Sequence, residues 1–126
     1  MILLDTSVLI DALSGPRRSA AALRGAIARG ERVMLVSLVL YEWLRGARLP
    51  EELEAQEALF PSGAVPGFGP EEADLAATLY RKVSRAPGRE IDLAIAASAL
   101  AWEATLWTLN VEDFEDLPGL VVERPG

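Results

Sequence analysis

Short, wholly apolar runs are spaced along the chain between longer segments of mixed polarity. The first run, Ile2-Leu3-Leu4, ends at Asp5, a pattern typical of a buried strand in a parallel sheet. The same pattern predicts strands at residues 33–36, 105–109 and 120–123. A fifth, very short strand is expected around Ala64 and Val65, inside a loop that is rich in proline and glycine. We therefore expect a sheet of about five strands.

Helices are predicted between these strands from their apolar spacing and from the residues at their ends. Gly30 ends one helix, Ser37 provides the N-cap of another, and Pro70 opens a third. The predicted helices span residues 8–13, 17–29, 38–48, 51–59, 70–84 and 91–103. Because strands alternate with helices, we expect an α/β fold with a mainly parallel sheet, formed by residues 1–126 as a single domain.

Composition narrows the chemistry that is open to the chain. Its 126 residues, 51% hydrophobic and 25% charged, suffice for one buried core and leave little room for a second. There is no cysteine and no histidine. Thiol catalysis, thiolate or imidazole zinc sites, disulfides and histidine-based nucleases or hydrolases are therefore excluded for this chain. Carboxylates, hydroxyls, amides and arginines remain.

The net charge of −7 by itself argues against a nucleic-acid partner. The argument weakens if several carboxylates share one metal site, because bound cations cancel negative charge where a phosphate approaches. Lys82 is the only lysine among the 12 basic residues. Since arginine suits bidentate contact with phosphate or carboxylate, these residues fit either an RNA backbone or an acidic protein.

No segment of the sequence is expected to span a membrane. The longest apolar stretch, residues 33–44, is interrupted by Ser37 and Glu42 and falls short of the roughly 20 residues that a bilayer requires. The first residues lack the basic region of a signal peptide. We therefore expect a cytoplasmic protein.

Four acidic residues stand directly after predicted strands or near the starts of helices: Asp5, Glu42, Asp92 and Asp113. Each has an ordinary structural alternative. Asp5 is placed to cap the next helix, and Asp92 to complement a helix dipole. Glu42 can pair with Arg45 one turn later, and Asp113 fits an acidic turn. Because sites in parallel sheets lie at the carboxyl ends of the strands, the fold can also bring all four together.

A shared site would give these carboxylates a chemical purpose. Carboxylates within a few ångström of one another repel, which raises their pKa values unless a cation intervenes. A divalent metal removes this conflict, and it can also orient a phosphodiester and lower the pKa of a bound water. Without histidine or cysteine, metal-assisted hydrolysis is the economical mechanism.

Four segments carry a family resemblance, in this order along the chain: Leu4-Asp5-Thr6-Ser7-Val8-Leu9-Ile10-Asp11, Ser37-Leu38-Val39-Leu40-Tyr41-Glu42-Trp43-Leu44-Arg45-Gly46, Asp92-Leu93-Ala94-Ile95-Ala96-Ala97, and residues 106–114. Together they resemble the motifs of PIN-domain nucleases, and more narrowly those of VapC-like toxins from type II toxin–antitoxin systems. The resemblance spans nearly the whole chain. It implies a three-layer α/β/α fold and a ribonuclease that depends on Mg²⁺ or Mn²⁺.

The resemblance also implies roles for individual acidic residues. Asp5, Glu42 and Asp92 would hold the metal, and Asp113 would supply a further catalytic charge. Family members often carry an aspartate at the place of Asn110, which here is an amide. Its carbonyl oxygen can still coordinate a cation or orient a water, so the identity of the fourth ligand and the number of metals, one or two, stay open.

Hydroxyl and basic residues near the motifs are secondary candidates. Thr6 and Ser7 are expected to hydrogen-bond around Asp5 or the phosphate, with helix capping as the alternative. Arg85 and Arg89, just before the third motif, are candidates to contact the RNA backbone, and a solvated loop is the alternative.

By the same resemblance, the protein is an endoribonuclease toxin that forms homodimers and is silenced by a cognate antitoxin covering the acidic pocket. A non-catalytic binding module with a vestigial pocket is the main alternative. A phosphoacceptor receiver domain is disfavoured because Lys82 falls within a predicted helix. A P-loop nucleotide hydrolase is excluded because no glycine-rich loop precedes that lysine.

Overall fold

Four parallel strands form the sheet at the centre of the molecule. The computed structural model describes residues 1–126 and contains β1 (Ile2–Leu4), β2 (Val33–Met34), β3 (Thr105–Trp107) and β4 (Val122–Glu123) in the order β2-β1-β3-β4. Strand β1 lies between β2 and β3, and its register pairs Ile2 with Thr105 and Leu4 with Trp107. The predicted parallel α/β class is confirmed.

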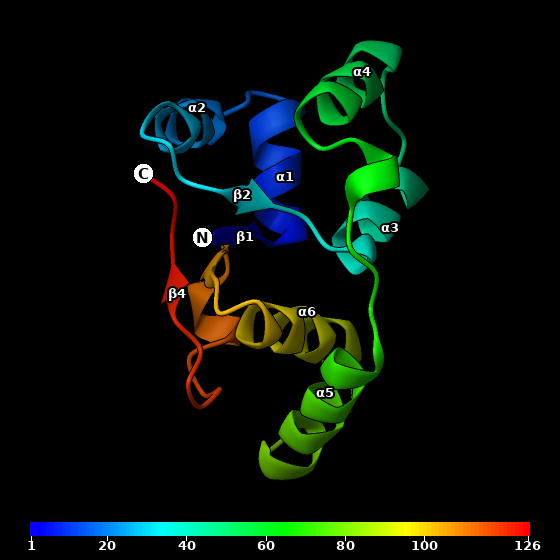
Figure 1. Ribbon diagram of the computed structural model, residues 1–126, viewed down its shortest axis with the longest axis vertical. Helices are drawn as coiled ribbons and strands as arrows, with labels where there is room; N and C mark the ends of the chain where they lie inside the picture. The colour runs from blue at the N-terminus through cyan, green and yellow to red at the C-terminus, as the bar shows by residue number, and fades with distance from the viewer.

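Six helices surround the sheet: α1 (Thr6–Leu13), α2 (Ala20–Ala28), α3 (Ser37–Arg45), α4 (Pro50–Leu59), α5 (Pro70–Lys82) and α6 (Glu90–Ala101). Helix α1 packs against α2, α3 and α4, and α5 packs against α6. In Figure 1, α1 and α2 lie on one side of the strands and α5 and α6 on the other. This is the expected three-layer arrangement.

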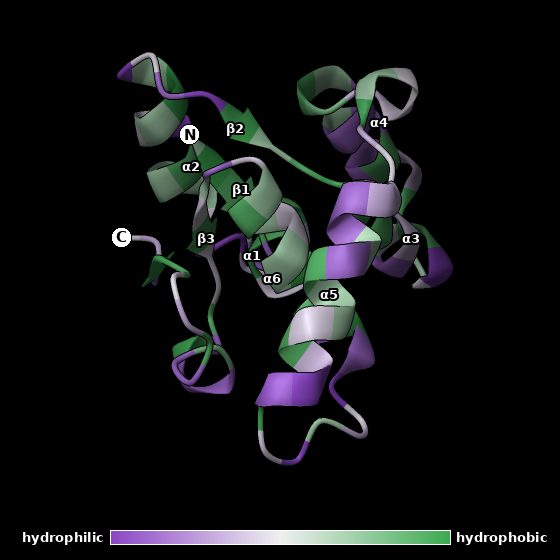
Figure 2. Cartoon of the chain, turned by 60° about the horizontal axis from the view of Figure 1, so that its bottom comes forward, coloured by the Kyte–Doolittle hydropathy of each residue, from purple (hydrophilic) through white to green (hydrophobic).

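Burial explains the composition of the central elements. All three residues of β1 are buried, as is the stretch of α6 from Leu93 to Ala99, because a helix that is apolar all round belongs in a core. Figure 2 shows β1 and β2 in the green of hydrophobic residues, whereas α5 carries many hydrophilic ones. No helix has the length and apolarity that crossing a membrane requires.

Several predicted boundaries are wrong by a few residues. Helix α1 already begins at Thr6, and Val36, not Ser37, takes the N-cap position of α3. Helix α2 begins only at Ala20, since Arg17 adopts a left-handed backbone with φ of 55°. The strands predicted at residues 33–36, 105–109 and 120–123 are shorter at one end or the other.

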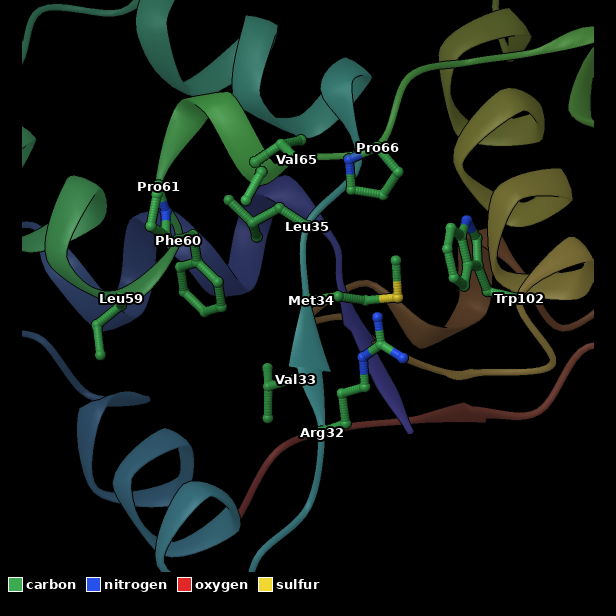
Figure 3. A pocket seen from close by; sticks show the side chains of 11 residues that line it. Arg32, Val33, Met34, Leu35, Leu59, Phe60, Pro61, Val65, Pro66 and Trp102 are labelled. Atoms are coloured by element: carbon green, nitrogen blue, oxygen red, sulfur yellow. The ribbon is translucent and has the colours of Figure 1, made fainter.

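The strand expected around Ala64 and Val65 is absent. The chain there forms a 3-10 turn, η1 (Ser62–Ala64), held by local backbone bonds and by Glu57, which accepts from both the amide and the hydroxyl of Ser62. One backbone hydrogen bond, donated by the Ser37 amide to the Pro66 carbonyl at 2.9 Å, ties the segment to the start of α3. Figure 3 shows Val65 and Pro66 beside Leu35, around a hollow of about 250 Å³. The sheet therefore has four strands rather than about five.

The strand order fixes where a site can form. From β1 the chain moves to β2 on one side, and it then returns to β3 on the other side of β1. The connections therefore diverge at the carboxyl ends of β1 and β3, the position at which open parallel sheets bind ligands. Asp5 and Thr108 directly follow these two strands.

Candidate active site

Asp5 is buried at the end of β1. Its backbone amide donates to the Trp107 carbonyl at 2.8 Å, which ties it to β3. It occupies the N-cap position of α1, but its side chain makes no capping bond. Oδ2 instead accepts hydrogen bonds from Thr108 Oγ1 at 2.7 Å and from Ser7 Oγ at 2.9 Å. The capping alternative is wrong, because the carboxylate is turned toward the carboxyl end of β3.

Thr108 is a site residue that sequence reasoning missed. Its side chain is fully buried, and Oγ1 also accepts the backbone amide of Asn110 at 3.0 Å. Ser7 Oγ in turn accepts the amide of Leu109 at 3.1 Å. Two hydroxyls thus fix both the Asp5 carboxylate and the turn after β3. Its position in the sequence could have indicated this role, because a residue that directly follows the strand paired with β1 lies beside Asp5.

Glu42 faces the same region from α3. Its Oε1 accepts a hydrogen bond from Thr6 Oγ1 at 2.5 Å, so Thr6 orients Glu42 rather than capping a helix. Its Oε2 lies 3.4 Å from Arg45 Nη2 in the expected i,i+3 pair. Arg45 is more than half exposed, with a side-chain exposure of 57% against 18% for Glu42, so water screens the pair.

Asp92 lies in the first turn of α6 and carries the clearest electrostatic signature of the site. Its pKa is raised to about 6, chiefly by burial and then by the negative charges of Asp5, Asp113 and Glu42, in that order, while Arg89 opposes the shift. Burial likewise raises the pKa of Asp5, partly offset by its bonds from Thr108 and Ser7. Asp5, Glu42 and Asp113 therefore all lie within electrostatic reach of Asp92.

The last two candidates come from the turn after β3. Asp113 lies in the 3-10 turn η2 (Val111–Asp113) and is exposed, as is Asn110. Asn110 enters the network through its backbone amide, which donates to Thr108. Its side chain makes no hydrogen bond, so the amide oxygen proposed as a ligand is not occupied by another contact.

The two arginines before α6 differ. Arg89 grips both carboxylate oxygens of Asp116, at 2.8 and 2.9 Å, and also donates to the Asp113 carbonyl. It braces the turn that carries Asp113, and it holds the pKa of Asp116 below its usual range. Arg85 is exposed with a φ of 58° and no side-chain partner. RNA contact by either residue stays a prediction, and Arg89 already has a carboxylate partner.

The donor set fits a hard divalent cation. Every candidate ligand is an oxygen, and the charges of Asp5, Asp113 and Glu42 each act on Asp92 more strongly than the opposing charge of Arg89 does. No three acidic side chains lie close enough together in this structure to hold a metal ion. The site is therefore a cluster of neighbouring carboxylates, in which binding an ion requires side-chain adjustment.

Replacing Thr108 by valine tests the role of its hydroxyl. Removing the donor leaves a buried carboxylate with one partner fewer, which costs about 1–3 kcal/mol. We expect Thr108→Val to lower the melting temperature and to raise the pKa of Asp5, whereas Thr108→Ser retains both values. NMR titration of the Asp5 carboxyl carbon checks this, and an unchanged titration curve in the valine variant would contradict it.

Comparison with known proteins agrees with this geometry. A family model described as the PIN domain matches residues 2–120. Ribonuclease VapC19 of Mycobacterium tuberculosis is 34% identical over 123 residues, covering 95% of this chain and 97% of that protein.

Two solved structures share the fold. VapBC2 from Rickettsia felis, bound to a promoter DNA fragment, has a TM-score of 0.80 and 23% identity over the full length of both chains. A toxin–antitoxin complex from Klebsiella pneumoniae has a TM-score of 0.71 and 27% identity, covering 96% of each chain. The acidic residues gathered near the carboxyl end of β1, the family match and the shared fold lead to one conclusion: this chain belongs to the PIN-domain family.

Proposed function

We propose that this protein is an endoribonuclease that hydrolyses RNA phosphodiester bonds at the acidic site with Mg²⁺ or Mn²⁺. The observation that carries the proposal is the position of Asp92, where burial, together with the charges of three other carboxylates, raises its pKa to about 6. Strongly perturbed groups in this kind of position are typical of functional sites. The 34% identity to a protein named as a ribonuclease supports the same substrate class.

In this proposal Asp5, Glu42 and Asp92 hold the cation. A bound divalent ion supplies Lewis-acid chemistry and neutralises negative charge at a phosphodiester. The chain contributes the positioning: Thr108 and Ser7 fix the Oδ2 atom of Asp5, which limits the orientations that this carboxylate can adopt.

Three further residues complete the assignment. Thr6 fixes the carboxylate of Glu42 through its hydroxyl. Asn110 is proposed as a fourth oxygen ligand or as the residue that orients the attacking water, with Asp113 adding charge next to Asp92.

The biological setting is also a proposal. We propose that residues 1–126 act in the cytoplasm as one nuclease domain, as a homodimer, and as the toxin of a toxin–antitoxin pair. Structures with the same fold include a VapBC complex and a toxin–antitoxin complex, which supports an antitoxin as the partner.

Cleavage of a fluorophore–quencher RNA by the purified protein tests the proposal. We expect cleavage with Mn²⁺ or Mg²⁺ and none with EDTA. Glu42→Gln should weaken the apparent affinity for Mn²⁺ by roughly 10–100-fold, because the variant loses a charged oxygen. Glu54→Gln, an exposed change on α4, is the matched control. Absence of both cleavage and any calorimetric response to Mn²⁺ would favour the non-catalytic binding module instead.

A further inference from the structure

A second hollow, of about 600 Å³, opens at the same edge of the sheet as the acidic site. It lies between α2 and the segment after β4, which Figure 1 shows near each other. Trp107 and Glu123, the last residues of β3 and β4, form part of its wall. Three arginines from separate parts of the chain line it: Arg18, Arg29 and Arg124. We call this hollow the arginine groove.

Hydrogen bonds connect the arginine groove to the acidic site. Arg124 Nη1 donates to the Leu109 carbonyl at 2.6 Å. The Leu109 amide donates to Ser7 Oγ at 3.1 Å, and Ser7 Oγ donates to Asp5 Oδ2 at 2.9 Å. Three hydrogen bonds, interrupted only by the backbone of Leu109, therefore connect Arg124 to Asp5.

The groove gathers positive charge in a chain whose net charge is −7. Arg18 is exposed and has neither an ion pair nor a side-chain hydrogen bond. Arg29 pairs with Glu31 at 3.0 Å, but exposures of 63% and 41% make that contact weak and exchangeable. Glu123 is the only acidic side chain in the lining. The guanidinium groups of Arg18 and Arg124 therefore have no carboxylate partner.

We propose that the arginine groove binds the phosphate backbone of single-stranded RNA on one side of the bond that is cleaved. The proposal rests on the proposed ribonuclease function for its substrate class. Guanidinium forks match phosphate oxygens, and contacts to phosphates position a strand without reading its sequence. The groove offsets the repulsion between RNA and the acidic site, and it holds the strand where one phosphodiester reaches Asp5.

Binding of a fluorescent uridine oligonucleotide, measured by anisotropy in EDTA, tests the groove without cleavage. We expect Arg18→Ala and Arg29→Ala each to weaken binding roughly three- to five-fold. Each should also reduce the slope of log affinity against log salt by about 0.7 in magnitude, because a complex with one phosphate contact fewer releases fewer counterions when it forms. Glu123→Gln should tighten binding by a similar factor, since it removes a repulsive charge.

Arg24→Ala is the matched control. Arg24 is an exposed arginine within α2, but it lines a different hollow together with Leu13 and Leu59. Its loss should therefore leave the affinity for RNA unchanged. Melting temperatures equal to that of the parent establish that each variant is folded, and Arg18→Gln repeats the test if Arg18→Ala is not.

The possible outcomes separate the groove from the nuclease. Unchanged affinity in Arg18→Ala and Arg29→Ala overturns the proposal, as does the absence of RNA binding by the parent. Tighter binding of a glutamate oligomer than of RNA of equal charge overturns it in favour of an acidic protein segment. Groove-dependent RNA binding by a parent that does not cleave with Mn²⁺ would refute the nuclease and support the groove.

Discussion

Asp92→Asn is expected to abolish RNA cleavage and, at the same time, to make the metal-free protein more stable at pH 7. The substitution keeps the size of the side chain and removes a charge that Asp5, Asp113 and Glu42 all repel. Activity should fall at least about a hundred-fold, because the site loses a charged metal ligand. Stability should rise by about 1 kcal/mol after allowing for solvent screening of a half-exposed group, or roughly 3 °C in melting temperature.

The opposite signs of the two effects make this variant informative. Substitution of a residue that is needed only for folding would lower the activity and the stability of the protein together. Asp74→Asn, an exposed change on α5, should alter neither quantity and also reports contaminating nuclease. Asp5→Asn should abolish cleavage as well, while the Oδ1 atom of the new amide can still accept from Thr108 or Ser7. Parent-like cleavage by a folded Asp92→Asn protein would refute the assignment of Asp92.

Position along the chain predicted much of this site. Asp5 directly follows the first apolar run, and Asp92 opens an apolar, alanine-rich helix. Once the sheet is parallel, both must approach the carboxyl end of β1. The alternation of strands and helices already places the strand ends on one edge, and the strand order, which brings β3 beside β1, then locates the site on that edge.

What the sequence could not predict depends on contacts between distant residues. Thr108 looks like an ordinary strand residue, and only the pairing of β1 with β3 reveals its bond to Asp5. Arg89 looks like a free basic residue, whereas folding brings Asp116, 27 positions away, against its guanidinium group. The missing fifth strand has a more local cause, because Glu57 binds Ser62 and stabilises a turn instead.

The pH dependence of stability should follow from the burial of these carboxylates and from the repulsion between them. Asp92 has a folded-state pKa of about 6 against an ordinary value of 3.8, so the folded protein binds a proton more tightly than the unfolded chain does. Stability from this group is full below pH 4 and is lost as the pH rises through 6. The pKa of Asp5 is raised as well, which acts in the same direction.

Restricting the measurement to pH 5–7 isolates this effect. Glu52, Glu57 and Asp116 have pKa values lowered by hydrogen bonds, so their opposite contributions fall mainly below pH 5, where their unfolded forms titrate. Urea unfolding in EDTA should therefore show the protein losing about 0.5–1 kcal/mol between pH 5 and 7. Asp92→Asn should largely remove this slope.

Bound Mn²⁺ should reverse the dependence of stability on pH. Protons and the cation compete for the same carboxylates, so metal binding strengthens as the pH rises. At a hundred times its dissociation constant a ligand stabilises the folded state by about 2.7 kcal/mol, which exceeds the loss from repulsion. With saturating Mn²⁺ the parent should thus be more stable at pH 7 than at pH 5, and Asp92→Asn should not. A metal-free parent whose stability rises from pH 5 to 7 would contradict the shared carboxylate site, because such a rise requires folded-state pKa values below those of the unfolded chain.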